Sequence, residues 1–400
     1  MLQECYSAIK CLLKHRESLT SISLLSAAEL PPFLYLITIF LLSASLGIAS
    51  PPAWAGGHPR PKSTVVYDAD LGNLLDEGTK AVLVPVSELK LRATQGDAAA
   101  QNNLAYLYTF GLEVPQDLSE AARWYARSAE QGFATAEYNL ATLYEHGLGV
   151  GRDLALAVKW YEEAAQQGHV LAQSRLGFMY ERGRGVQASL GEATKWYRAA
   201  AERGDRSSQC RLGQGYFSGR GVARDLREAA KWFRLSAEQG FAAAQNNLAA
   251  LYHHGWGVQA DYEQALRWYR AAAEQGLAAA KNSIGVLYQD GLGVPRDYTQ
   301  AAHWFRLAAE QGDAGGEYDL ATLYAAGRGV TLDYVSAYVW YSLAASAGEP
   351  RGAQPLKALS RLMTPRQRKD AEARLTDLQA PRNSDQQRET AAFRGLPEDQ

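Results

Sequence analysis

The sequence predicts an all-α solenoid, and three regularities lead to this prediction. Glycine recurs at an interval of 36 residues, the segments between these glycines carry apolar residues at helical spacing, and the same aromatic positions return in every interval. A period between about 20 and 50 residues indicates stacked units that are each too small to bury their own apolar face. The period glycines are Gly96, Gly132, Gly168, Gly204, Gly240, Gly276, Gly312 and Gly348.

Each interval contains two predicted helices. In one unit, Ala244, Leu248 and Leu251 lie at i, i+4 and i+7 and predict an amphipathic helix over residues 241–254. A second apolar stripe, which includes the tryptophan, predicts another helix over residues 261–275. Every unit is therefore expected to be a hairpin of two amphipathic helices.

Residues typical of helix boundaries stand at fixed places in the unit. Asp261 is the expected N-cap of the second helix, and Gln264 three residues later is typical of a capping box. The period glycines follow the second helix and suit the left-handed conformation at a helix end. Gly255 and Gly257 form the expected turn between the two helices, and only the first unit departs from this pattern, with Glu113 in place of the second glycine.

Three ladders of apolar side chains recur in phase and are expected to form the core. One is aliphatic, one is tyrosine, and one is tryptophan. Since neighbouring units stabilise one another in a solenoid, these ladders are expected to hold the array together. The members are Leu104, Leu140, Leu176, Leu212, Leu248, Ile284 and Leu320; Tyr108, Tyr144, Tyr180, Tyr216, Tyr252, Tyr288 and Tyr324; and Trp124, Trp160, Trp196, Trp232, Trp268, Trp304 and Trp340.

Charge and cysteine content exclude several classes of function. The chain has 41 Lys and Arg against 43 Asp and Glu, so no overall field attracts nucleic acid, which is not an expected partner. The three cysteines are Cys5, Cys11 and Cys210, so neither a disulfide framework nor a cysteine-based zinc site can be assembled within the array. The sequence predicts no cofactor and no metal.

The N-terminal region carries the pattern of an export signal. The uncharged apolar run 33–49 follows Lys10 and Lys14 and precedes the small residues Ala53 and Ala55, so cleavage is expected near Ala55. An uncleaved signal-anchor is the alternative, because a run of about 17 apolar residues is just long enough to cross a bilayer. In either case the repeats are expected in the periplasm or another extracytoplasmic part of the envelope.

These patterns divide the chain into five segments. Proline and glycine near the start suit an exposed linker, and the polar C-terminal stretch has little to bury, so disorder is expected there. The predicted segments are a signal peptide or membrane anchor (1–55), a linker and atypical N-terminal cap (56–84), the repeat array (85–348), C-terminal capping helices (349–379) and a disordered tail (380–400).

The unit from Ala244 to Gly276 reads A-x-x-x-L-x-x-L-Y-x-x-G-x-G-V-x-x-D-x-x-x-A-x-x-W-Y/F-x-x-A-A-E-Q-G and resembles the Sel1-like repeat, a relative of the tetratricopeptide repeat. The pattern recurs seven times over residues 96–348. The resemblance implies a right-handed superhelix of antiparallel helix pairs, whose first helices line a concave groove for protein partners. It also implies exported adaptors or regulators among bacterial members. A cysteine-rich subfamily linked to penicillin binding or hydrolysis has a disulfide in each unit, which this sequence lacks.

No catalytic constellation is apparent, and three motifs have structural explanations. The Gly-x-Gly turns follow helices and lack a phosphate-facing lysine, which favours turns over nucleotide-binding loops. Ser87 and Lys90 spell S-x-x-K, a signature of penicillin-interacting serine enzymes, without its companion motifs. His253 and His254 are helix neighbours that diverge by about 100 degrees, so solvated side chains are expected rather than metal ligands.

Partner-binding residues are expected where the units differ, because positions shared by all units serve stacking. Several variable positions of the first helices hold large aromatic residues, which are the rigid anchors that interfaces favour. The predicted groove residues are Tyr106, Phe110, Tyr138, Arg175, Phe178, Arg211, Phe217, Asn246, His253 and Tyr318.

Basic residues also recur on the second helices, as at Lys231 and Arg234. A solvated face braced by glutamates, such as Glu228 with Lys231, is one explanation. A docking stripe for an acidic partner is the other.

The predicted function is a non-catalytic, exported scaffold or adaptor that binds protein partners through the groove of the first helices. A regulatory subunit of a bacterial envelope signalling system is the first alternative. A cell-wall-active or β-lactam hydrolase is an alternative of another class, and it requires a serine beside a base, for which the sequence shows no pattern.

Overall fold

The computed structural model of the protein describes residues 65–66, 82–83 and 85–394. The apolar run 33–49, on which the export prediction rests, lies outside the described residues. Among the helices that are described, none combines the length and the hydropathy needed to cross a lipid bilayer.

The described chain consists of helices that follow one another, preceded by two short strands that pair antiparallel. The strands are β1 (Val65–Val66) and β2 (Val82–Leu83), with Val65 opposite Leu83. The helices are α3 (Val86–Thr94), α4 (Ala98–Phe110), α5 (Leu118–Ala129), α6 (Ala134–His146), α7 (Leu154–Gln166), α8 (Val170–Arg182), α9 (Leu190–Glu202), α10 (Arg206–Ser218), α11 (Leu226–Glu238), α12 (Ala242–His254), α13 (Tyr262–Glu274), α14 (Ala278–Asp290), α15 (Tyr298–Ala309), α16 (Ala314–Ala326), α17 (Tyr334–Ser346), α18 (Ala353–Leu362) and α19 (Pro365–Arg394).

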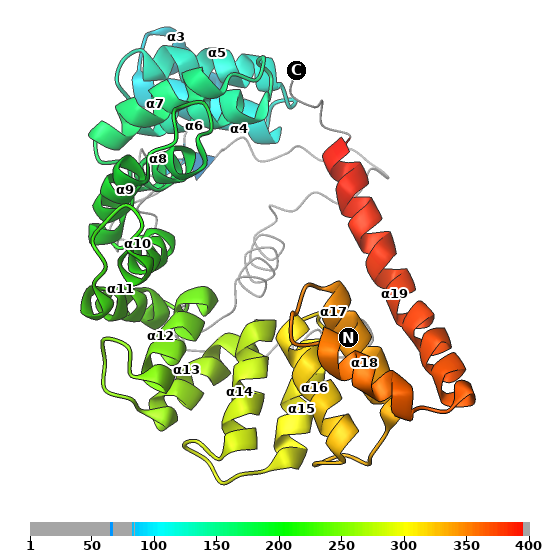
Figure 1. The fold of residues 1–400 in the computed structure, drawn as a ribbon. Helices are drawn as coiled ribbons and strands as arrows, with labels where there is room; N and C mark the ends of the chain where they lie inside the picture. The colour runs from blue at the N-terminus through cyan, green and yellow to red at the C-terminus, as the bar shows by residue number, and fades with distance from the viewer. Residues whose placement is uncertain (1–64, 67–81, 84, 395–400) are drawn as a thin grey trace, which may run out of the picture. The chain divides into compact units, whose positions relative to one another are not determined.

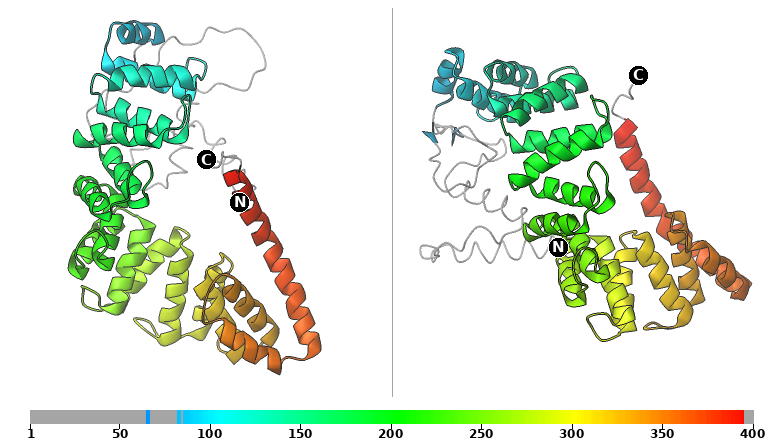
Figure 2. Two further views of the ribbon diagram at one scale, coloured as in Figure 1. Left: turned by 45° about the horizontal axis from the view of Figure 1, so that its top comes forward. Right: turned by 60° about the vertical axis from the view of Figure 1, so that its left-hand side comes forward.

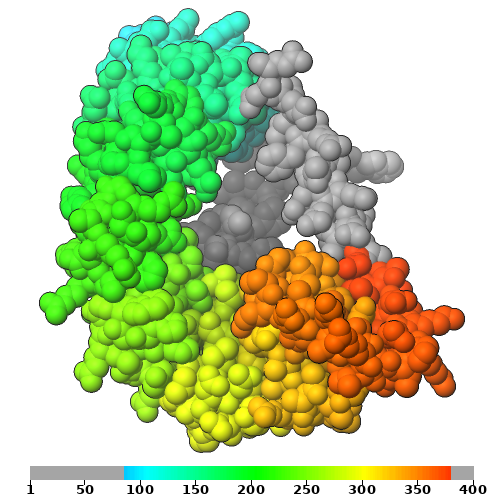
Figure 3. All heavy atoms as spheres, viewed as in Figure 1, coloured from blue at the N-terminus to red at the C-terminus, as the bar shows by residue number. Residues whose placement is uncertain are grey.

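Each repeat is a hairpin of an even-numbered first helix and the odd-numbered second helix that follows it, from α4–α5 to α16–α17. Every helix of the array packs against the helices before and after it, so consecutive hairpins lie side by side in chain order (Figures 1 and 2). In the space-filling view, neighbouring repeats form a continuous surface (Figure 3). Successive first helices also contact each other, as α14 does α16 and as Asn139 does Asn102 at 3.3 Å. The first helices therefore share one face of the array.

The helix boundaries of the repeats lie where the sequence predicts them. Every second helix from α5 to α17 begins after an Asp or Ser whose side chain accepts a backbone N–H. For Asp261 the donor is the N–H of Gln264, 2.9 Å away. The first helix of the same repeat ends at Gly255, which is in the left-handed conformation.

The second glycine of each turn is required by the neighbouring repeat. A Cβ on Gly257 would lie 2.1 Å from the carbonyl oxygen of Leu226, at the start of the preceding second helix. In the first repeat this position is Glu113, with a φ of 58°. The second helix that packs before the first repeat is α3. It begins only at Val86, later in the register than the other second helices. A side chain is tolerated there because no helix start lies at that register position.

The aliphatic ladder is the centre of the core, as predicted, since each of its members is at most 1% exposed. The tyrosine and tryptophan ladders are only partly buried, apart from Tyr216 and Trp232, so the prediction that they belong to the core is wrong for most of their members. The aromatic residue that follows each tryptophan is buried instead, as at Tyr161 and Phe305. Its ring points into the hairpin, whereas the tryptophan covers the junction between repeats.

The tyrosine ladder joins neighbouring repeats through a basic row on the second helices. Arg198 donates a hydrogen bond to the hydroxyl of Tyr216 at 2.8 Å, and Arg234 donates to Tyr252 at 2.9 Å. The same contact recurs in the next two repeats. These arginines brace the array, which favours the structural explanation of this row over a docking stripe.

Helices α18 and α19 cover the last repeat. Leu359 of α18 and Ala371 of α19 are buried in one cluster with residues of α17. Helix α19 continues to Arg394, so the prediction of a disordered tail is wrong for residues 380–394, while 395–400 lie outside the described residues. This stretch contains three Ala, three Arg and two Gln, which favour helix, whereas the prediction considered polarity alone.

We expect Trp232→Ala to uncouple the two halves of the array. Trp232 is 7% exposed, and truncation of a buried tryptophan costs about 3–5 kcal/mol. In a nearest-neighbour array this loss weakens both adjoining interfaces. Calorimetry should therefore show two thermal transitions. The control is Trp256→Ala, at a tryptophan that is 40% exposed, which should leave the profile unchanged. A single transition of the Trp232 variant near the parent temperature would contradict the expectation.

Candidate functional site

All ten predicted groove residues lie on first helices. Their register positions within the repeat fall within an arc of about 120 degrees around the helix axis and so belong to one helical face. The residues are Tyr106 and Phe110 in α4, Tyr138 in α6, Arg175 and Phe178 in α8, Arg211 and Phe217 in α10, Asn246 and His253 in α12, and Tyr318 in α16.

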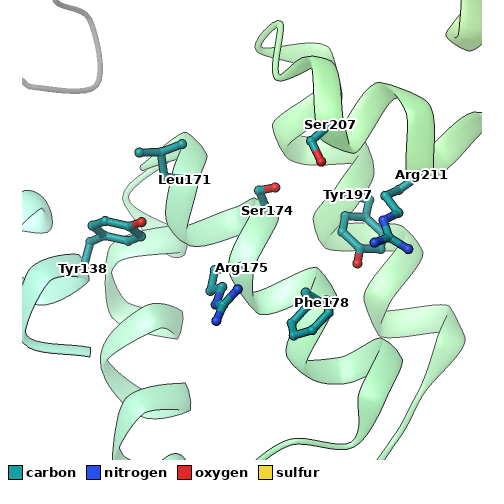
Figure 4. A pocket seen from close by; sticks show the side chains of 8 residues that line it. All are labelled: Tyr138, Leu171, Ser174, Arg175, Phe178, Tyr197, Ser207 and Arg211. Carbon is teal, nitrogen blue, oxygen red and sulfur yellow. The ribbon is translucent and has the colours of Figure 1, made fainter. Parts of the chain in front are cut away.

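Four of the ten come together in one pocket between α6, α8, α9 and α10. Tyr138, Arg175, Phe178 and Arg211 line a cavity of about 360 Å³, together with Leu171, Ser174, Tyr197 and Ser207 (Figure 4). We refer to it as the Arg175 pocket. Its wall combines two guanidinium groups, three aromatic rings and two hydroxyl-bearing serines, a composition suited to a peptide with both polar and apolar groups.

Arg175 is held in place by a buried carboxylate of the preceding repeat. Glu145 accepts two hydrogen bonds from its guanidinium, and also one from the hydroxyl of Tyr161 at 3.0 Å. The guanidinium lies 5.0 Å from the centre of the Phe178 ring. Burial opposes ionisation of Glu145, but the hydrogen bonds and charge of Arg175 outweigh it and hold the pKa of Glu145 below its usual value. The pair is thus a fixed, ionised wall of the pocket.

Arg211 is held less tightly. Its guanidinium lies 3.6 Å from the carboxylate of Glu181, which also accepts a hydrogen bond from Tyr197 at 2.8 Å. The side chain of Arg211 is 37% exposed. Because an exposed ion pair at this distance contributes little, the guanidinium is able to bind a further anionic group.

Phe217 lies in a second pocket, of about 260 Å³, between α10, α11 and α12. Its walls include Phe233, Leu251 and Trp256. The rings of Phe217 and Trp256 are 5.5 Å apart. We refer to this as the Trp256 pocket, and its lining is more apolar than that of the Arg175 pocket.

A third depression, between α9 and α10, was not predicted. Gly215 and Arg220 line it with Leu190, Ala193 and Tyr197, and its volume is about 90 Å³. Arg220 also lines the Trp256 pocket, and Tyr197 also lines the Arg175 pocket, so the three are adjoining. We call it the Gly215 hollow. The signal that could have revealed it is a missing apolar residue, because the other six repeats have Leu or Met where Gly215 stands.

The remaining predicted residues make separate local contacts. The rings of Tyr106 and Phe110 are 4.6 Å apart within α4. Tyr318 packs against Tyr341, and the guanidinium of Arg351 lies 4.4 Å from the centre of its ring. The structure therefore does not unite the ten residues in one site.

The two adjacent histidines do not point apart as expected. Their ring centroids are 4.5 Å apart and the rings are stacked. His254 is the last residue of α12, and its ring stacks in turn on Trp256 at 4.3 Å, which brings it over His253. Burial, followed by the charge of His254, lowers the pKa of His253.

The residues considered as candidate nucleophiles or metal ligands do not lie together in one site. Ser87 is exposed in the first turn of α3, and the ammonium of Lys90 lies 5.9 Å from the centre of the Tyr108 ring. Burial raises the pKa of the Cys210 thiol to about 11, so it is protonated at neutral pH. Within the part of the chain that the structure describes, no three His, Cys, Asp or Glu side chains are grouped as metal ligands.

The comparison with protein families decides what kind of array this is. The model of the Sel1 repeat matches seven consecutive segments, 98–133, 134–169, 170–205, 206–241, 242–277, 278–313 and 314–349. The chain belongs to the Sel1-repeat family. Sel1-repeat proteins generally act in protein–protein interaction, as non-catalytic scaffolds.

The solved structures that are similar to the chain include the following two. One is c5321, described as a protective antigen of uropathogenic Escherichia coli strains with an SLR fold; it is 36% identical, with 72% of this chain and 70% of that chain covered and a TM-score of 0.49. The other is a Sel1 repeat protein from Oxalobacter formigenes, which is 35% identical, with 68% of this chain and 80% of that chain covered and a TM-score of 0.54. No curated protein matches the sequence.

The second Sel1 repeat, like the seventh, has a buried glutamate at a position where most repeats have glutamine. Glu137 is 3% exposed and accepts a hydrogen bond from Gln167 at 2.8 Å. Four of the seven repeats have glutamine at this position, and Gln209 there donates to the carbonyl of Ala201. Burial, together with the charge of Glu163, raises the pKa of Glu137 to about 7.

We expect Glu137→Gln to stabilise the protein, and more so as the pH rises. In the parent, the folded state keeps a proton on Glu137 between about pH 4.5 and 7 that the unfolded state has lost, so stability falls across this range. Glutamine removes this fall and restores the repeat's usual hydrogen bonds. The gain at pH 8 should be on the order of 1–3 kcal/mol, measured by urea unfolding at pH 5 and pH 8.

The reverse change supplies the matched control. Gln209→Glu places a carboxylate opposite Gln239, as Glu137 lies opposite Gln167. Its destabilisation should increase from pH 5 to pH 8. Equal effects of Glu137→Gln at both pH values would show that the carboxyl does not titrate in this range.

Proposed function

We propose that this protein is a non-catalytic, exported scaffold that binds a protein partner through the face shared by its first helices. The observation that carries the proposal is the run of three adjoining depressions on the second to fifth Sel1 repeats, the Arg175 pocket, the Gly215 hollow and the Trp256 pocket. Four of the ten predicted groove residues line the first of them, and a fifth lines the last.

The lining supports a peptide rather than a small metabolite. The depressions follow successive repeats, so an occupant that fills all of them must be extended along the array. Aromatic rings and arginines line each of the three depressions, and these are the residue types that dominate binding energy in protein interfaces. Arg175 and Phe178 are prearranged by Glu145, which reduces the entropy that binding must remove.

Export is proposed from the sequence of the N-terminal region. The apolar run 33–49 and the small residues near Ala55 are typical of a secretory signal. An extracytoplasmic scaffold needs no cysteine if its repeats are stabilised by packing, and the buried aliphatic ladder supplies that packing.

A photo-reactive amino acid on the first-helix face should capture the partner in cells. We expect Phe178 and Phe217, replaced one at a time by benzoyl-phenylalanine, to form discrete crosslinked species, because both line depressions. Leu235 on second helix α11 is 39% exposed and serves as the control. Equal crosslinking from Leu235, or none from either groove position, would count against the groove.

Alanine variants give the energetic test of the same face. Tyr106→Ala combined with Phe178→Ala should weaken binding of the captured partner by about 2 kcal/mol or more. Since both side chains are only partly buried, the thermal midpoint should change little. Unchanged affinity of the double variant would be incompatible with binding through these rings.

Processing at the N-terminus is a separate prediction. Mature protein isolated from the envelope should begin at Gly56, which follows the small residue expected before the cleavage site. Ala55→Asp should block cleavage, because the site requires a small residue, and should leave a membrane-bound precursor. Intact-mass spectrometry of the two proteins is the measurement. A full-length chain in the cytosolic fraction would refute export.

A further inference from the structure

Positive charge is concentrated in two repeats at the centre of the array. Residues 170–241, which form the third and fourth Sel1 repeats, contain 13 Lys and Arg against 7 Asp and Glu. Each of the other five repeats has more acidic than basic residues. The balance of charge over the whole chain conceals this local excess.

The Gly215 hollow lies within this positive segment and has the shape of a missing leucine. In the second repeat, Leu143 takes the equivalent position and is buried in one cluster with Ala121 and Tyr125 of the helix before it. The corresponding residues of α9, Ala193 and Tyr197, line the hollow instead. An apolar surface that receives a leucine elsewhere in the array is thus left open beside Gly215.

Two guanidinium groups flank the hollow. Arg211 and Arg220 both line it. Arg211 has one carboxylate near it, that of Glu181 at 3.6 Å, which also lines the hollow and leaves one positive charge in excess there. Among the described residues, Arg220 forms no ion pair. An occupant that carries carboxylates beside an aliphatic side chain would satisfy both the charge and the apolar surface.

We propose that the Gly215 hollow binds a leucine-sized aliphatic side chain in an acidic segment of the partner protein, with Arg211 and Arg220 holding the flanking carboxylates. The proposal rests on the proposed function and names the chemistry of the partner. Charge complementarity favours this occupant, because among the seven repeats only the two that frame the hollow have more basic than acidic residues. The side chain from the partner takes the place that the chain's own leucine or methionine takes in the other six repeats.

The test uses the full chain and short fluorescein-labelled peptides, each with one leucine among glutamates at varied offsets. Fluorescence anisotropy should show saturable binding, which weakens when the leucine is replaced by glycine or the glutamates by glutamine. Higher salt should also weaken it, because screening reduces the attraction between exposed charges.

Gly215→Leu is the decisive variant. A Cβ on Gly215 would meet the carbonyl oxygen of Arg220 at 3.4 Å, an ordinary contact, and a leucine would fill the hollow as in other repeats. We expect the thermal midpoint to stay or rise, while peptide affinity falls by about tenfold or more, the loss that corresponds to a leucine side chain left unburied. Gly191→Leu on α9 is the control, because a Cβ there would meet nothing within 4 Å.

The arginines are tested in the same assay. Arg211→Gln and Arg220→Gln should each weaken binding and reduce its dependence on salt. Arg227→Gln removes the same charge from an exposed position on second helix α11 and should change neither. If Arg227→Gln weakens binding as much as the other two variants, the peptides respond to the overall positive charge of the segment and not to the hollow. This result would overturn the assignment.

Other outcomes also overturn the proposal. Binding that Gly215→Leu leaves unchanged would exclude the hollow. Tighter binding of a single-stranded oligonucleotide than of any peptide would assign the positive segment to nucleic acid, and self-association abolished by Gly215→Leu would assign the hollow to a second copy. If partner crosslinking at Phe178 persists in the Gly215→Leu background with full affinity, the proposed function stands and this inference fails.

Discussion

The structure depends on one constraint: a hairpin of two short helices cannot bury its own apolar face, so each repeat is completed by its neighbours. Leu248 and Leu251 of one repeat are buried in the same cluster as Phe233 of the repeat before it. The close approach of neighbouring repeats also explains the turn glycines, since a Cβ on Gly257 would collide with Leu226. Every position that contacts the next repeat must therefore recur at 36 residues, which is why the period is visible in the sequence.

Buried polar groups obey this constraint as well. The amide of Gln245 donates to the carbonyl of Ala237 in the preceding repeat at 3.2 Å and accepts from Gln275 of its own repeat at 2.8 Å. One glutamine thus joins two hairpins because an amide both donates and accepts. An ionised carboxylate can only accept, so at Glu137 the same surroundings favour the protonated acid. The pKa of Glu137 is therefore raised because a carboxyl group occupies a stacking position whose surroundings suit an amide.

The sequence predicted what recurs and failed where one repeat differs from the next. Helix boundaries, caps and the aliphatic ladder followed from periodicity. The burial of the tryptophans did not, because a period marks a shared contact without saying how much of the ring is covered; the more deeply buried ring is the next residue, as at Tyr161. Four residues that line the Arg175 pocket were among the predicted groove residues, because they differ from one repeat to the next. The Gly215 hollow was missed because a site made by the loss of a side chain presents no residue to notice.

A nearest-neighbour architecture explains how such a loss is tolerated. Each repeat interacts only with its two neighbours, so a weakened contact in one place leaves distant interfaces intact. Gly215 nevertheless lowers the free energy of unfolding in two ways, because glycine disfavours a helix interior and because an apolar surface stays unfilled. Together these effects are on the order of 2–4 kcal/mol relative to a leucine. The defect lies between Arg211 and Arg220, in the segment that holds the excess of positive charge. The missing apolar side chain and the excess of positive charge coincide at one place, and a common partner explains both, because stacking alone requires neither of them.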